Sequence, residues 1–215
     1  MPPPPPDEPT SQEAVEDWVR RQTQARDRFA HVYRASEQHR LQHGSDCTVY
    51  PSSVGPLLGT LAAATGAKRI LEVGCGLGYS ALWLASGSAP DGRVETFEQD
   101  PAHVELARRH FEQEGFANRV TVHHEGAAQG MARMDGPYDL IFCDGDLTEY
   151  LEDFAHFRRL LRPGGLLVTS NLFLGRYGLD IPGLDQAAAY RRRVLDDERL
   201  LTAFLPSGLA LSVRR

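Results

Sequence analysis

Cysteine, long apolar runs and an excess of basic charge are scarce or missing in this chain of 215 residues. The cysteines, Cys47, Cys75 and Cys143, are odd in number and lack CxxC spacing, so we expect neither a disulfide framework nor a structural zinc site. No stretch approaches the roughly 18 apolar residues that span a bilayer, and the first residues do not resemble a signal peptide. We therefore predict a cytoplasmic protein that does not enter a membrane.

The charge balance also argues against a nucleic-acid partner. The formal net charge is -6 at pH 7, whereas proteins that bind a phosphate backbone usually carry clustered Lys and Arg. We therefore expect the protein to act on a small molecule.

Length and composition predict one domain with an N-terminal arm. Residues 1–10 are rich in proline and are expected to form a disordered tail. Residues 11–50 carry apolar side chains at helical spacing, which predicts an N-terminal helical extension or cap. Residues 51–215 are long enough for one full-sized core.

From Gly66 onward, strand-like apolar runs alternate with segments of helical length, as in repeated βα units. This order predicts a doubly wound α/β fold whose sheet is mostly parallel. Pro163-Gly164-Gly165 is expected to turn the chain into the fifth strand, and the last two of seven strands are expected to form an antiparallel hairpin. The expected strands are Arg69 to Val73, Arg93 to Phe97, Arg119 to His123, Tyr138 to Cys143, Leu166 to Ser170, Leu200 to Leu205 and Leu209 to Val213.

The most informative segment is a glycine-rich turn between the first of these strands and a helix. Gly74, Gly76 and Gly78 follow an apolar strand and precede the helical pattern that begins near Ser80. Glycines at such a turn let the backbone approach a ligand and present its amides, as in Rossmann-like nucleotide sites. A dinucleotide fingerprint requires GxGxxG, but Tyr79 occupies the position of its third glycine.

An acidic residue completes this pattern one strand later. Glu98 ends the second strand, 20 positions after Gly78, where a carboxylate can accept both hydroxyls of a ribose. Asp100 precedes a proline and is expected to cap the following helix. Together the turn and the acid predict an adenosine-containing cofactor.

With these residues in place, the chain resembles the cation-dependent O-methyltransferases, which include the catechol and caffeoyl-coenzyme A O-methyltransferases. The resemblance covers roughly residues 45 to 215. It rests on LEVGCGLGYSALWLA, VETFEQDPAHVELARRHF, EGAAQ, YDLIFCDGD and LLRPGGLLVTSNLF.

The resemblance implies S-adenosylmethionine as the cofactor and assigns residues to each part of it. Glu98 would hold the ribose, and Ala127 and Gln129 would lie near the adenine. Asp144, at the end of the fourth strand, would face both the cofactor and a metal ion. The residues implied at the methionine end are Glu72, Gly74, Cys75, Gly76 and Ser80.

The same resemblance implies a divalent cation, usually Mg²⁺, held by Asp144 and by an Asp-Asn pair after the fifth strand. Here that pair is Ser170-Asn171, and Leu147 stands where the family has lysine. Replacing an acid by a hydroxyl removes a negative charge that a hard cation prefers. A site at Asp144 and Asn171 therefore remains one hypothesis, and the loss of the site is the other.

Methyl transfer requires an aligned and deprotonated nucleophile. Without a cation, His43, in the segment before the sheet, is a candidate base. Phe173, Tyr177 and Trp83 are candidates for an aromatic acceptor pocket, although core packing is the default for Trp83. The segment 173–184 is a candidate lid.

The leading hypothesis is therefore an O-methyltransferase acting on a hydroxyl of a small, aromatic or natural-product acceptor, with or without a divalent cation. One alternative is a metal-independent methyltransferase of an amine or a modified tRNA base. Another is a cofactor-binding protein without catalysis. The apolar side of the N-terminal helix predicts a homodimer.

Overall fold

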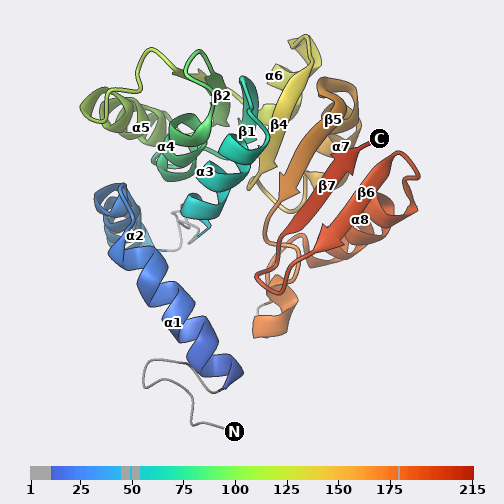
Figure 1. Ribbon diagram of the computed structural model, residues 1–215, viewed down its shortest axis with the longest axis horizontal. Coiled ribbons are helices and arrows are strands. Elements are labelled where there is room, and N and C mark those ends of the chain that lie inside the picture. The colour runs from blue at the N-terminus through green and yellow to red at the C-terminus, as the bar shows by residue number, and fades with distance from the viewer. Residues whose placement is uncertain (1–10, 45–48, 50–53, 179) are drawn as a thin grey trace, which may run out of the picture.

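The computed structural model describes residues 11–44, 49, 54–178 and 180–215, and a seven-stranded sheet lies at its centre (Figure 1). The strands are β1 Arg69–Val73, β2 Arg93–Glu98, β3 Val120–His124, β4 Tyr138–Cys143, β5 Leu161–Thr169, β6 Leu200–Phe204 and β7 Ala210–Arg214. Their spatial order is β3-β2-β1-β4-β5-β7-β6. Strands β1 to β5 are parallel, whereas β7 is antiparallel to both of its neighbours. The predicted α/β, doubly wound architecture is confirmed.

Helices cover both faces of the sheet, because side chains along the central strands alternate between two apolar cores. Ile70 and Leu140 face the core that contains α3, α4 and α5, whereas Leu71 and Ile141 face the core that contains α6, α7 and α8. Among the described residues, no helix combines the length and apolar character needed to cross a membrane. The helices are α1 Gln12–Ala25, α2 Ala30–His43, α3 Gly55–Ala64, α4 Tyr79–Gly87, α5 Pro101–Gln113, α6 Ala127–Arg133, α7 Tyr150–Leu160, the 3-10 helix η2 Leu174–Tyr177 and α8 Leu184–Asp196.

Strand β5 differs from the prediction at its start. It begins at Leu161, which pairs with Tyr138, so Pro163-Gly164-Gly165 lies within the strand. The pairing register shifts between Tyr138 and Leu140, and this irregularity absorbs the proline and glycines that indicated a turn. The strand therefore begins earlier than predicted, and residues 162–165, with Gly164 at φ of 73°, form a bulge before the regular pairing that resumes at the predicted start, Leu166.

The predicted C-terminal hairpin is confirmed, with β6 and β7 paired antiparallel. Strand β7 also pairs with β5 and therefore lies between β5 and β6. The last strand in the sequence consequently holds the previous one in the sheet.

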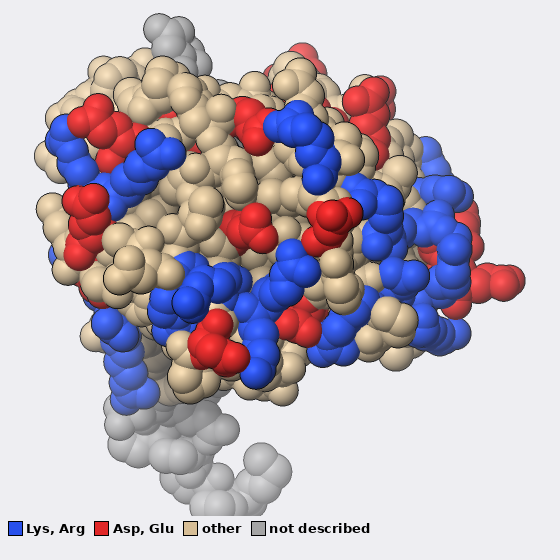
Figure 2. Space-filling model, turned by 90° about the horizontal axis from the view of Figure 1, so that it is seen from above, with Lys and Arg blue, Asp and Glu red and all other residues tan. Residues whose placement is uncertain are grey.

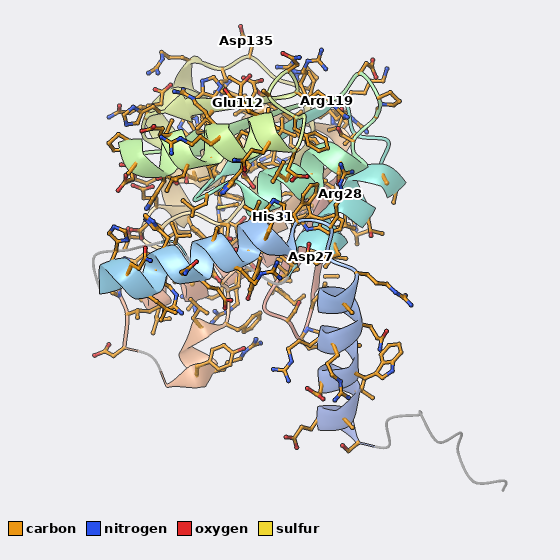
Figure 3. The ribbon with its side chains drawn as sticks, turned by 90° about the vertical axis from the view of Figure 1, so that its left-hand side faces the viewer. Asp27, Arg28, His31, Glu112, Arg119 and Asp135 are labelled. Carbon is orange, nitrogen blue, oxygen red and sulfur yellow. The ribbon has the colours of Figure 1, made fainter. Side chains whose placement is uncertain are left out.

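The N-terminal extension consists of two helices with different surroundings. No described residue of α1 is buried, and α1 extends away from the sheet (Figures 1 and 3). Helix α2 instead lies along α5 and packs Phe29, Val32 and Ser36 against the body (Figure 3). Residues 1–10, predicted to be a disordered tail, lie outside the described residues.

Asp27, just before α2, fixes the extension to α4. Its carboxylate accepts hydrogen bonds from the Tyr79 hydroxyl at 2.7 Å and from Trp83 Nε1 at 3.2 Å. Phe29 packs edge-on against Trp83, with ring centroids 5.2 Å apart. Trp83 therefore packs at the α2–α4 contact, as the default interpretation had it, and does not form part of an acceptor pocket.

Candidate cofactor and acceptor cleft

A cleft of about 520 Å³ opens at the carboxyl ends of β1, β2, β4 and β5. This is the edge of a doubly wound sheet at which ligands bind, because the strand order reverses between β1 and β4. The volume lies within the range of small-molecule pockets. The predicted site residues that line it are Gly74, Cys75, Gly76, Ser80, Glu98, Ala127, Asp144 and Asn171.

The glycine turn has the close approach that its sequence predicts. Gly74 and Gly78 both have φ of 91°, a left-handed conformation that favours glycine. A Cβ on Gly74 would lie 2.6 Å from the carbonyl oxygen of Asp144, and a Cβ on Gly78 would lie 2.6 Å from the Phe111 ring. These glycines therefore allow β1, β4 and α5 to meet directly beneath the cleft.

Glu98 is held at the end of β2 by backbone amides. Its Oε2 accepts from the Gly76 N–H at 2.8 Å, and its Oε1 accepts from the N–H groups of Gln99 and Asp100, each at 2.9 Å. Asp100 caps α5 as predicted, because its side chain accepts from the N–H groups of Ala102 and His103. The carboxylate of Glu98 is thus fixed beside the glycine turn.

Glu72 lies beneath the cleft and is fully buried. Its Oε2 accepts from the Thr96 hydroxyl at 2.6 Å, and Oε1 has no hydrogen-bond partner among the described residues. Burial raises the pKa of Glu72 to about 8, against hydrogen bonds from Ser80 and Thr96 that favour the charged form. Glu72 therefore supports the floor of the cleft and is not among the residues that line it.

Asp144 follows β4 and lies among polar groups from the end of β5. The Ser170 hydroxyl and the Asn171 side-chain amide, the latter at 2.7 Å, both donate to Asp144 Oδ1. Asn171 has φ of 60°, which turns its side chain back toward β4. Burial raises the pKa of Asp144 to about 6, although both hydrogen bonds oppose this shift.

These groups do not fit a divalent cation. Asp144 supplies the single carboxylate of the trio, and the Ser170 hydroxyl is already directed at Asp144 Oδ1 and at the Cys143 carbonyl oxygen. Mg²⁺ and Ca²⁺ prefer several oxygen ligands with more negative charge. Within the described part of the chain, no group of three or more His, Cys, Asp or Glu side chains is arranged to hold a metal ion.

The charge of the cleft is uniformly negative. Among the described residues that line it, no side chain is lysine or arginine. Figure 2 shows the opposite end, uppermost in Figure 1, where blue and red side chains are intermixed. Ion pairs there join Lys68 to Asp91 and Arg162 to Asp139. The charged side chains that line the cleft are Glu98, Asp100, Glu125, Asp144, Asp146 and Glu149.

Some predicted residues lie away from the cleft. Gln129 is exposed on the outer side of α6, and His43 lies exposed at the end of α2 with Nδ1 2.9 Å from the His39 carbonyl oxygen. Phe173 packs against Phe204, and Tyr177 is 62% exposed. From the candidate lid, the cleft is lined instead by Leu174, Ile181 and Pro182.

Sequence reasoning missed residues that reach the cleft from outside the main motifs. Ser36 comes from α2, Val49 from the segment after it, and Glu149 from the loop after β4. The helical spacing of Phe29, Val32 and Ser36 contained a signal for the first of these, because it places Ser36 on the buried face.

The fold and the cleft define a Rossmann-like α/β protein with a small-molecule site at the switch point of the sheet. Residues 30–213 match the family model described as O-methyltransferase. A relative from Mycobacterium sp. (strain JLS), named as an O-methyltransferase, is 38% identical over 75% of this chain and 76% of its own length. Another from Mycobacterium tuberculosis (strain H37Rv) is 39% identical over 73% of this chain and 72% of its own length. This chain therefore belongs to the O-methyltransferase family.

Solved structures agree in fold. The O-methyltransferase from Bacillus cereus in complex with SAH is 23% identical, with a TM-score of 0.76 over 94% of this chain and 100% of that one. TomG from Streptomyces achromogenes, solved with SAM and involved in tomaymycin synthesis, is 24% identical. Its TM-score is 0.77 over 95% of this chain and 99% of TomG. At these identities the likeness shows a common architecture.

Proposed function

We propose that this enzyme transfers the methyl group of S-adenosylmethionine to a hydroxyl of a small acceptor in the cleft, without a divalent cation. The observation that carries the proposal is that the glycine turn, Glu98 and Asp144 open into one cleft at the switch point. The SAM and SAH of the structural neighbours support the choice of cofactor.

Each part of the cofactor has a matching part of the cleft. Glu98, at the end of β2, accepts the ribose hydroxyls, and Ala127 lies at the adenine. Gly74, Cys75, Gly76 and Ser80 surround the methionine end. The acidic lining suits S-adenosylmethionine, because its sulfonium gives the cofactor a net positive charge.

In this proposal the carboxylate of Asp144 binds the hydroxyl group of the acceptor. Its Oδ1 is occupied by Ser170 and Asn171, and no described residue forms a hydrogen bond to Oδ2. The acceptor O–H donates to Oδ2 while its oxygen attacks the methyl carbon, the carbon–sulfur bond breaks, and the proton passes to the carboxylate or to water. Ser170 and Asn171 act by holding Asp144 in place.

The cleft favours a neutral or cationic acceptor. Leu147, Leu174, Ile181 and Pro182 offer apolar contacts, while Asp146 and Glu149 add negative charge to the lining. An acceptor with phosphate or carboxylate groups would be repelled, since no described lining residue is basic. Small neutral phenols and alcohols, and hydroxylated amines, are the classes to screen.

Calorimetry and a turnover screen test the proposal. Wild-type protein should bind SAH with or without EDTA and should methylate a hydroxyl of one of these acceptors equally well in both. Asp144→Asn should retain SAH binding within about threefold and lose at least about a hundredfold in kcat, as expected for a positioned proton acceptor. Loss of activity in EDTA that Mg²⁺ restores would overturn the metal-free mechanism. SAH binding without turnover on any acceptor would indicate a binding protein.

We also propose that the protein forms a homodimer through α1. Val15, Trp18 and Val19 are 39%, 43% and 49% exposed and share one helical face, as i, i+3 and i+4 positions do. A second copy of the chain would bury this face. Light scattering should give the mass of two chains for the wild type and of one chain for Trp18→Glu, whereas a monomeric wild type would contradict the proposal.

The compartment proposed is the cytoplasm. Cys75 and Cys143 are free, buried thiols, which suit a reducing environment. Fractionation of cells that express the protein should recover it in the cytosolic fraction, and recovery elsewhere would reject the assignment.

A further inference from the structure

A pair of histidines connects helix α2 to Glu98, which lines the cleft. His39, in the penultimate turn of α2, and His103, in the first turn of α5, have their Nε2 atoms 3.2 Å apart. Their rings meet edge to face, with centroids 5.0 Å apart. At this distance one proton is shared between the two nitrogens, so one imidazole donates and the other accepts.

The second nitrogen of His103 faces Glu98. The His103 side chain is 6% exposed, and its Nδ1 lies 3.6 Å from Glu98 Oε1. Among the described residues, that Nδ1 has no hydrogen-bond partner at shorter range. The other groups that hold Glu98 are backbone amides of Gly76, Gln99 and Asp100. Within the described chain, His103 is therefore the side-chain donor directed at this carboxylate.

We propose that His103 is a positioning residue for the cofactor, held between His39 and Glu98, and that it couples ribose binding to the docking of α2. The inference rests on the role proposed above for Glu98. His103 can contact Glu98 through Nδ1 and His39 through Nε2 only in one ring orientation. A ligand that orders Glu98 stabilises this orientation and so favours the contact with His39. A docked α2 stabilises the same orientation and so favours the contact with Glu98. Thermodynamic linkage makes the two effects equal.

The protonation of the pair supports this arrangement. Glu98 raises the pKa of His103, whereas burial, followed by the neighbouring His43 and His103, lowers the pKa of His39. The charged groups that face the pair are Glu98, His43, whose ring centroid is 4.1 Å from that of His39, and Asp100, whose Oδ2 is 4.0 Å from His103 Nε2. A protonated His103 therefore donates to a neutral His39.

Both pKa shifts define the pH window of the contact. His103 contributes below its unfolded pKa of about 6.5, and this contribution is lost as the pH rises through its raised folded pKa. Acid below the lowered folded pKa of His39 protonates the second ring, and the two cations then repel each other. Coupling should be strongest between the lowered folded pKa of His39 and about pH 6.5, and should weaken on both sides.

The test compares SAH affinity in four variants near pH 6.5, at the upper end of this window. His103→Phe removes both contacts and should bind SAH about tenfold more weakly, as expected for a lost contact to a charged group. His103→Asn keeps an amide donor near the Nδ1 position and should recover most of the affinity. His39→Phe should also weaken binding, by about threefold. His31→Ala is the matched control, because His31 makes another contact between α2 and the body, 3.1 Å from Glu114, at the end of α2 away from His39.

Two further measurements separate positioning from general stabilisation. In the wild type, SAH should slow hydrogen exchange in the last two turns of α2, and this protection should be lost in His103→Phe and His39→Phe. The Kd of the wild type should pass through a minimum with pH, and His103→Phe should flatten that minimum. In turnover assays, His103→Phe should raise KM for the cofactor and leave kcat within about twofold.

The inference would be overturned if His103→Phe bound SAH as tightly as the wild type, or if His31→Ala lost as much SAH affinity as His103→Phe. If His103→Phe does not fold, His103→Asn and His39→Phe decide the question by the same exchange measurement. Glu98→Gln tests the role of Glu98 separately. Unchanged SAH affinity in Glu98→Gln would reject the assignment of Glu98 to the ribose. Weaker SAH binding in Glu98→Gln together with wild-type binding in His103→Phe would reject only the role of His103.

Discussion

At the residue scale, Asp153 carries a buried carboxylate that lacks a full set of partners. It lies on the inner face of α7, 1% exposed, and its Oδ1 has no hydrogen-bond partner among the described residues. Burial raises the pKa of Asp153 to about 7. Because this is above the unfolded value of about 3.9, the native state binds the proton more tightly, and stability is lost as the pH rises from about 4 to about 7.

Asp153→Asn should therefore stabilise the protein at alkaline pH. The amide keeps the shape and removes the charge, so we expect a gain of about 1–3 kcal/mol in the free energy of unfolding at pH 8.5, which becomes smaller toward pH 5. Urea denaturation at several pH values measures this. Glu112→Gln, at an exposed position of α5 and not among the groups that shift Asp153, is the control and should change little. A gain that is constant with pH would argue against titration as its cause.

Ser170 is the residue that distinguishes this site from a cation site. Ser170→Asp places a second carboxylate against Asp144, so the variant should bind Mg²⁺ in the presence of SAH, whereas the wild type should not. The same variant without metal should be less stable by about 1–3 kcal/mol, because the two acids repel each other. Calorimetry and thermal melts measure the two effects. Ser170→Asn should show neither metal binding nor metal-dependent stabilisation, and Mg²⁺ binding by the wild type would refute the interpretation of the site.

At the scale of elements, the attachment of α2 depends on Asp27, which joins two side chains of α4. Asp27→Ala leaves the Tyr79 hydroxyl and the Trp83 indole N–H without this acceptor. We expect a loss of about 1.5–3 kcal/mol in the free energy of unfolding and faster proteolysis between α1 and α2. Asp17→Ala, on the exposed α1, is the control. Equal stability of the two variants would show that Asp27 does not hold α2.

The elements themselves were predictable because their patterns are local. Short apolar runs, each interrupted by one acid, identified Ile70–Val73 and Tyr138–Cys143 as central strands, and the glycine turn identified the start of α4. The start of β5 was not predictable, since Pro163 and two glycines indicate a turn unless a strand irregularity absorbs them. The position of Gln129 could have been found, because Ala127, Gly130 and Met131 define the buried face of α6 and leave Gln129 outside it.

The site was predictable where it follows from strand ends and less so where it depends on docking. Glu98 and Asp144 end parallel strands, and parallel strands present their carboxyl ends at one edge, so their meeting follows from topology. His103 and His39 meet only because α2 lies along α5 (Figure 3). No local pattern in either helix specifies that contact.

At the scale of the whole molecule, charge is divided between the two ends of the sheet. The cleft is lined by carboxylates, whereas basic side chains at the opposite end are intermixed with acids (Figure 2). SAM carries a positive charge that SAH lacks, so the cleft should favour SAM electrostatically at low ionic strength. Raising the salt concentration from about 0.02 M to about 0.5 M should reduce this preference by roughly two- to fivefold. Calorimetric titrations with SAM and with SAH at each salt concentration measure the ratio of the two affinities. At low salt, Glu149→Gln should prefer SAM over SAH less strongly than the wild type does. A ratio that does not respond to salt would count against electrostatic selection.

The place of β7 in the sheet bears on how the protein is made. Ribosomes release a chain from its N-terminus onward, and β5 has no neighbour on its outer side until residues 210–214 emerge and pair with it. Strand β6, although synthesised earlier, reaches the sheet only through β7. During translation the nascent polypeptide therefore exposes an open strand edge until residues 210–214 arrive, and a ribosome stalled before residue 210 would leave a product prone to aggregation.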